Sequence, residues 1–136
     1  MELQVGVKVL LRNSEGKFLL IKRSAKKYPE VGPRWDIVGG RINPGSSLLE
    51  NLRREVKEET QLDLTDDPRL VAAQDILRFP GRHVVRLTYT AEITGTPVLD
   101  EEHEAYQWAT LEEIKSLPKD QLDIYFRELL EEGKFG

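Results

Sequence analysis

Residues 54–62 read Arg-Glu-Val-Lys-Glu-Glu-Thr-Gln-Leu, a short distance after the glycine pair at 39–40. Three glutamates in this stretch, Glu55, Glu58 and Glu59, stand at i, i+3 and i+4, which places them on one side of a helix. Like charges at this spacing repel one another unless a cation lies among them. Carboxylate oxygens are ligands that suit Mg²⁺ or Mn²⁺. The stretch therefore predicts a helix that holds divalent metal, and metal held in this way usually serves phosphate chemistry.

The helical angles single out Glu59. At roughly 100° per residue, Glu59 falls about 40° from Glu55, between Leu48 at about 20° and Leu52 at about 60°. An ionised carboxylate on such an apolar arc costs several kcal/mol, or it takes up a proton. A bound cation would remove that cost.

The alternative interpretation is a solvated acidic surface helix. The pairs Glu50–Arg54 and Arg54–Glu58 have the i, i+4 spacing of helix ion pairs and account for part of the pattern. They do not account for Glu59, so metal binding is the favoured interpretation.

Composition narrows the class of protein. The chain has 136 residues, a net charge of -4, no cysteine and two histidines. We expect one domain over residues 1–136 with a real hydrophobic core. The acidic balance argues against long nucleic acid as a partner. The absence of cysteine excludes disulfides, and two histidines make a histidine-based zinc site a poor expectation. No apolar run reaches the ~20 residues of a membrane span, and the start lacks a signal-peptide pattern, so a cytoplasmic location without membrane contact is expected.

The order of predicted elements indicates an α/β protein of the α+β type, with a mixed sheet sandwiched between helices. Alternating apolar residues from Leu3 to Leu11 indicate the first strand. Ser47 with Glu50, and Thr110 with Glu113, have the spacing of capping boxes. We expect strands at 3–11, 17–23, 35–38, 69–79, 85–93 and 106–109, helices at 47–61, 110–117 and 122–130, and a polar loop at 25–33.

The segment Gly40 to Leu62 resembles the Nudix box, the loop-helix-loop motif of Nudix hydrolases. The matching positions at the family's spacing are Gly40, Arg54, Glu55, Val56, Glu58, Glu59 and Leu62. The rest of the chain is compatible with the family: a strand pair precedes the box, and an acidic loop precedes a tryptophan after it. The resemblance therefore implies a Nudix-like fold over most of the chain.

Two positions depart from the motif. Ser46 stands where the family has its first glutamate, which in the family is usually a partner of the box arginine. We expect the loop to be weakened there, with Glu50 as a substitute partner for Arg54. Gln61 stands where the family has glycine. If the helix ends in a left-handed residue, Gln61 carries strain of about 1 kcal/mol.

The resemblance also implies the metal site. Glu55, Glu58 and Glu59 would hold one to three Mg²⁺ or Mn²⁺ ions, with the backbone carbonyl of Gly39 as a further ligand. Such ions bridge diphosphate oxygens and lower the pKa of a bound water, which attacks one phosphorus. A further carboxylate, as ligand or base, is often supplied by the loop before the penultimate strand. Glu102, six residues before Trp108, fits that place, and Glu104 competes with it.

Positive groups are needed for the phosphates, because arginine makes bidentate contacts with them. Arg23 ends the second predicted strand and Arg41 follows the glycine pair, so both are candidates for substrate binding. Gly40 and Arg54 are expected to be structural members of the motif. Trp35, Phe79 and Tyr89 could stack on a base, although isolated aromatic residues are more often core.

The implied function is metal-dependent hydrolysis of a diphosphate linkage in a nucleoside diphosphate linked to another group. The favoured substrate is a nucleoside triphosphate, oxidised ones of the 8-oxo-dGTP type included, cleaved to monophosphate and pyrophosphate. One alternative is a pyrophosphatase for ADP-ribose or nucleotide sugars, and another is a non-catalytic nucleotide sensor. The sequence leaves the oligomeric state open, although homodimers are frequent in the family.

Overall fold

The computed structural model describes residues 1–29 and 34–136. Its strands are β1 Glu2–Arg12, β2 Phe18–Arg23, β3 Trp35–Asp36, β4 Val38–Arg41, β5 Arg69–Ile76, β6 Arg82–Glu92 and β7 His103–Ala109. Its helices are α1 Leu48–Thr60, α2 Leu111–Lys115, the short 3₁₀ helix η1 Lys119–Gln121, and α3 Ile124–Glu131.

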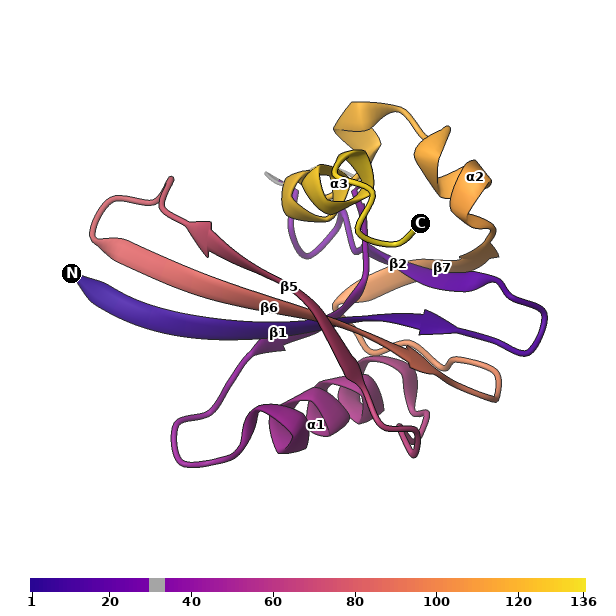
Figure 1. Ribbon diagram of the computed structural model, residues 1–136, viewed down its shortest axis with the longest axis horizontal. Coiled ribbons are helices and arrows are strands. Elements are labelled where there is room, and N and C mark those ends of the chain that lie inside the picture. The colour runs from indigo at the N-terminus through magenta and orange to yellow at the C-terminus, as the bar shows by residue number, and fades with distance from the viewer. Residues whose placement is uncertain (30–33) are drawn as a thin grey trace.

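The strands form one mixed sheet around a long parallel pair. The sheet order is β3-β2-β1-β6-β5, with β4 paired to β1 and β7 paired to β2. Strands β1 and β6 run parallel from Glu2 opposite Arg82 to Arg12 opposite Glu92. Helix α1 covers one face of the sheet, and α2 and α3 cover the other (Figure 1). The predicted fold class, a mixed sheet between helices, is confirmed.

The alternation of β1 builds two cores, one on each face of the sheet. Val7, Val9 and Leu11 pack with Leu52 and Val56 of α1. Leu10, between them in sequence, points to the other face and packs in the cluster that contains Phe126 of α3. Successive side chains of a strand point to opposite faces, so one strand serves both layers.

Most predicted elements are present, with shifted ends. The segment at 35–38 forms two short strands, β3 and β4, where one was expected. Strand β5 ends at Ile76, before the predicted 79, and β7 begins at His103, before the predicted 106. Part of the predicted 25–33 loop, residues 30–33, lies outside the described residues. None of the described helices is long and apolar enough to cross a membrane.

Helix α1 begins and ends as its sequence predicts. The Ser47 hydroxyl accepts a hydrogen bond from the Glu50 backbone N–H at 3.1 Å. At the other end Gln61 adopts φ 61°, ψ 12°, the left-handed conformation that glycine prefers. Gln61 is the one non-glycine residue with positive φ in the described part of the chain. Gln61 therefore has the left-handed conformation in which a residue other than glycine is expected to carry strain.

Candidate active site

The three glutamates of α1 lie in different surroundings. Glu59 is buried, and its Oε1 accepts a hydrogen bond from the Gly39 backbone N–H at 2.8 Å. The Glu55 side chain is 12% exposed and Glu58 is 55% exposed. The helix therefore places one carboxylate inside the protein, one at the rim and one in solvent.

Burial sets the protonation of the inner carboxylates. It raises the pKa of Glu59 to about 8, against the opposing effects of the Lys8 ammonium and the Gly39 N–H. Burial also raises the pKa of Glu55, with Arg54 opposing. Glu55 has Arg54 as its counter-charge, whereas Glu59 forms no ion pair with a lysine or arginine that the structure describes. The site fits a divalent cation, which would favour the ionised form of both groups.

The glycine pair lets the helix and the sheet approach each other. Gly39 has φ 142°, and a Cβ there would overlap the carbonyl oxygen of Val7 on the paired strand β1. A Cβ on Gly40 would lie 2.8 Å from a carboxylate oxygen of Glu55. Only glycine fits at either position without moving the strand or the carboxylate. The glycine pair therefore allows the α1 glutamates to pack against the sheet.

Arg54 ties the helix to the loop that precedes it. It donates to Glu55 Oε1 at 2.9 Å and lies 3.3 Å from a Glu58 carboxylate oxygen. It also donates to the backbone carbonyl of Arg41 and to Asn51 Oδ1, each at 3.1 Å. One guanidinium thus holds two of the candidate metal ligands and the residue after the glycine pair.

The substitute partner expected for Ser46 was wrong. Glu50 forms no hydrogen bond or ion pair with Arg54, and buried Asn51 does so instead. The Asn51 amide also donates to the Ser46 carbonyl at 3.2 Å and accepts from the Asn43 N–H at 2.8 Å. Sequence reasoning missed Asn51 because it sought a charge, and a neutral amide ties the loop to the helix.

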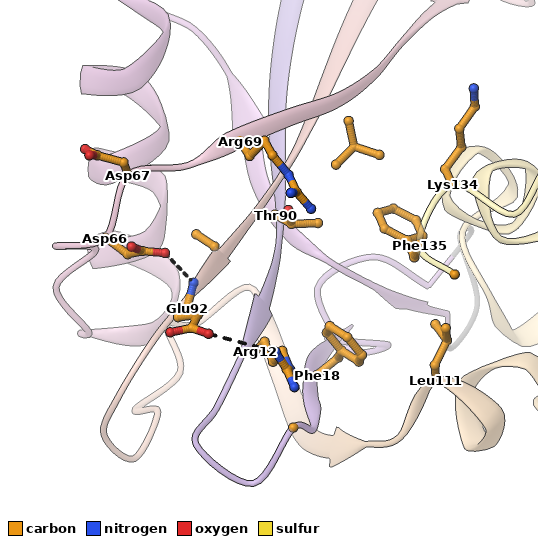
Figure 2. Close-up of a pocket in the computed structure, with 14 residues that line it drawn as sticks. Arg12, Phe18, Asp66, Asp67, Arg69, Thr90, Glu92, Leu111, Lys134 and Phe135 are labelled. Carbon is orange, nitrogen blue, oxygen red and sulfur yellow. Dashed lines mark hydrogen bonds and ion pairs between the residues drawn. The ribbon is translucent and has the colours of Figure 1, made fainter.

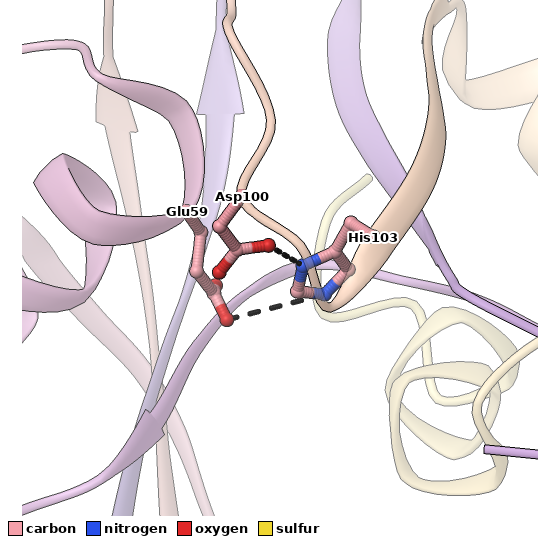
Figure 3. A group of neighbouring side chains, drawn as sticks. All are labelled: Glu59, Asp100 and His103. Carbon is pink, nitrogen blue, oxygen red and sulfur yellow. Dashed lines mark hydrogen bonds and ion pairs between the residues drawn. The ribbon is translucent and has the colours of Figure 1, made fainter. Parts of the chain in front are cut away.

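Two residues near Glu59 were also missed: Asp100 lies in the loop before β7, and His103 is the first residue of β7. Figure 3 shows Asp100 and His103 facing Glu59. His103 Nδ1 lies 2.7 Å from Asp100 Oδ1, and His103 Nε2 lies 4.0 Å from Glu59 Oε2. The sequence-based prediction favoured Glu102 and Glu104 of this acidic run, although Asp100 and His103 were equally visible signals in it.

The predicted loop carboxylates are placed differently from each other. Glu104 Oε1 accepts a hydrogen bond from the Ala25 N–H at 2.6 Å, so it fastens the loop after β2. Glu102 is half-buried, and its backbone N–H donates to Asp100 Oδ1 at 3.2 Å. The Glu102 side chain makes no hydrogen bond or ion pair with a described residue. Its role as ligand or base stays a prediction.

A cleft of about 350 Å³ borders the glycine pair. Its basic lining residues are Lys8, Arg23, Arg34, Arg41, Arg78 and Arg86, and its acidic ones are Asp36 and Asp123. Lys8 and Arg86 form ion pairs with those two aspartates. The other four arginines form no ion pair with any residue that the structure describes.

The predicted substrate-binding residues Arg23 and Arg41 both line this cleft, with Phe79. Burial lowers the pKa of Arg41, and so do the charges of Arg82, Arg86 and Arg23. An excess of crowded positive charge is unfavourable until an anion enters. Of the other aromatic candidates, Tyr89 belongs to the core. Trp35 contacts Lys22 through its ring.

A larger cavity of about 830 Å³ lies elsewhere, between the ends of β1, β5 and β6 and the C-terminal segment (Figure 2). It contains none of the predicted site residues. Its charges partly satisfy one another, since Arg12 lies 3.9 Å from Glu92 and Asp66 accepts from the Glu92 N–H at 2.9 Å. The predicted site residues Arg23, Gly39 and Arg41 line the smaller cleft instead.

A carboxylate-bearing helix beside a cleft whose arginines include four without ion pairs to described residues fits an enzyme of phosphoric-anhydride chemistry. Comparison with known proteins identifies the family. A model of the NUDIX domain matches residues 2–132, so the chain belongs to the Nudix family. The predicted pyrophosphohydrolase class is confirmed.

Known relatives share the fold and differ in their named substrates. The MutT protein from Methanosarcina mazei Go1 has a structure that superposes with a TM-score of 0.83, at 30% identity, covering 96% of this chain and 92% of that one. Nucleoside triphosphatase NudI of Escherichia coli is 30% identical over 114 residues, 76% of this chain and 80% of the relative. NAD-capped RNA hydrolase NudC of Stutzerimonas stutzeri is 30% identical over 110 residues, 79% of this chain but only 37% of NudC.

Proposed function

We propose that the protein hydrolyses a diphosphate linkage in a nucleoside diphosphate linked to another group, with Mg²⁺ or Mn²⁺ as cofactor. The favoured substrate is a nucleoside triphosphate, cleaved to monophosphate and pyrophosphate. The observation that carries this proposal is that Glu59 and Glu55 of α1 lie against the same glycine pair that lines the arginine-rich cleft. The carboxylates bind the cation there, and the arginines bind the phosphates.

The metal ligands in this proposal are Glu55, Glu58, Glu59, the Gly39 carbonyl and Glu102. The ions would supply a Lewis acid that withdraws charge from the phosphates and activates water. Glu59 is held in place by the Gly39 N–H, so its carboxylate needs little reorganisation to accept a cation. Glu55 is oriented in the same manner by Arg54.

The cleft favours a substrate with several phosphates. Arg23 and Arg41 are proposed to bind them, and Arg34 and Arg78 extend the positive surface of the same cleft. Six basic and two acidic side chains give the lining an excess of four positive charges, in a chain whose net charge is -4. A triphosphate matches this excess better than the diphosphate of ADP-ribose or of a nucleotide sugar. The name of NudI, a nucleoside triphosphatase, supports the same choice.

The test is a substrate panel with Mg²⁺ and with Mn²⁺. It contains the common and oxidised nucleoside triphosphates, ADP-ribose and a nucleotide sugar, with nucleoside monophosphate, phosphate and pyrophosphate measured separately. We expect pyrophosphate from at least one triphosphate. No product from any of them, together with tight retention of one, would establish the nucleotide sensor instead.

Matched variants test the residues. Glu58→Gln and Glu59→Gln should each lower the rate by roughly 100-fold or more, in line with loss of a metal or charge-stabilising group. Glu50→Gln, on the same helix but exposed, is the control and should keep the wild-type rate. Full activity in both site variants would show that these glutamates do not form the site.

A further inference from the structure

His103 is a partly buried histidine whose Nδ1 is engaged and whose Nε2 makes no hydrogen bond with a described residue. Its side chain is 7% exposed, and Nδ1 lies 2.7 Å from Asp100 Oδ1. An ionised carboxylate only accepts hydrogen bonds, so Nδ1 donates to Asp100, and in the neutral imidazole Nε2 keeps its lone pair. Nε2 faces Glu59 Oε2, another atom that accepts no hydrogen bond from a described residue (Figure 3).

Two ligand atoms that face each other across such a gap can share a cation. The separation of 4.0 Å between Nε2 and Oε2 is too long for a hydrogen bond. Two ligands that each lie about 2.1 Å from one ion are roughly 3 to 4 Å apart. The gap therefore fits a shared metal ion.

Asp100 completes the group. Ligand atoms of Glu59, Asp100 and His103 all lie within 4.8 Å of one another. The Asp100 oxygen that binds His103 also accepts from the Glu102 N–H, and its second oxygen has no partner among the described residues. One oxygen thus shapes the loop while the other remains available to a cation.

We propose that Glu59, Asp100 and His103 form a mixed nitrogen–oxygen metal position, selective for transition ions such as Mn²⁺, Co²⁺ or Zn²⁺ over Mg²⁺. Imidazole nitrogen is a good ligand for those ions, whereas Mg²⁺ favours oxygen. This position differs from the carboxylate set of Glu55 and Glu58 in having a nitrogen donor. It shares Glu59 with the proposed catalytic site, and it rests on that proposal only through this residue.

The nitrogen donor can be observed directly, without turnover. One equivalent of Mn²⁺ is added to the full chain, and electron spin-echo modulation from ¹⁴N is recorded. The chain has two histidines, His83 and His103, which supplies a matched pair of variants. His83 is bound to Asp75 at 2.7 Å, outside the site.

We expect imidazole modulation in the wild type and in His83→Gln, and its loss in His103→Gln. Absence of modulation in the wild type, or its loss in the His83 variant alone, would overturn the proposal and leave His103 and Glu59 as a simple ion pair. If His103→Gln does not fold, the wild type still decides. Zn²⁺ should then shift the ¹⁵N resonance of His103 Nε2 and not those of His83, and unchanged His103 resonances would refute the assignment.

Affinity measurements give the selectivity. His103→Gln should weaken Mn²⁺ binding roughly 10- to 100-fold, the range seen when groups that support a metal site are removed. Mg²⁺ binding should change less than about 2-fold, because the oxygen ligands remain. Equal losses for both ions would contradict the proposed selectivity. Hydrolysis of the substrate panel is scored separately, so an inactive protein with ¹⁴N modulation would refute the function and keep the metal position.

Discussion

Replacement of Glu59 by glutamine should make the metal-free protein more stable, and more so as the pH rises. Burial raises the pKa of Glu59 to about 8 from its usual 4.5. Between these values the folded protein holds a proton that the unfolded chain has released, so the free energy of unfolding falls as pH rises through this window. At about 1.4 kcal/mol for each pH unit, the full cost above pH 8 is on the order of 5 kcal/mol.

Glutamine removes that cost and can still accept the hydrogen bond from Gly39. The assay is urea unfolding in EDTA at intervals from about pH 5 to 8.5, on the wild type, Glu59→Gln and Glu58→Gln. We expect the stability advantage of Glu59→Gln to be small near pH 5 and to grow by several kcal/mol by pH 8.5. Glu58 is 55% exposed, so its variant should follow the wild type. Parallel curves for all three proteins would refute the idea that Glu59 is a destabilising buried acid.

Divalent metal should narrow this stability difference, because it binds the folded wild type and not the unfolded chain. At 100 times its dissociation constant the gain is about 2.7 kcal/mol.

Three further changes have defined outcomes. Asn51→Ala should lower the free energy of unfolding by about 1 to 3 kcal/mol in urea, because it leaves buried loop groups without partners; an unchanged midpoint would contradict its role in tying the loop. Gln61→Gly should raise the free energy of unfolding by up to about 1 kcal/mol by relieving the left-handed backbone, and a loss in thermal unfolding would argue against strain there. Arg41→Gln should raise KM for a triphosphate roughly 10-fold or more, because a charged contact with phosphate is lost. Arg69→Gln, outside the cleft, is the control and should not change KM. Equal KM values for the two variants would show that Arg41 does not bind phosphate.

Patterns among residues close in sequence were enough to predict much of the fold and part of the candidate site. The helical period alone placed Glu59 among apolar residues, and the structure buries it. The alternation of β1 and the Ser47 cap fixed the strand and the helix that frame the site. These features depend on residues close in sequence, where the period of a helix or strand decides which side chains share a face.

The remaining parts depend on contacts between distant segments. Lys8 influences the site because β1 pairs with β4, which places Lys8 opposite Gly39. His103 meets Glu59 only after the loop before β7 folds against α1. Asn51 ties the loop through hydrogen bonds to backbone groups, where a charged partner was expected. A search for residues of opposite charge does not find an uncharged side chain of this kind.

The central claim is that the α1 carboxylates converge on divalent metal, and calorimetric titration with Mn²⁺ tests it most directly. Wild type and Glu50→Gln should show the same saturable binding, and Glu59→Gln should bind at least about 10-fold more weakly. Equal binding by all three proteins, or no binding by the wild type even with nucleotide present, would contradict the claim.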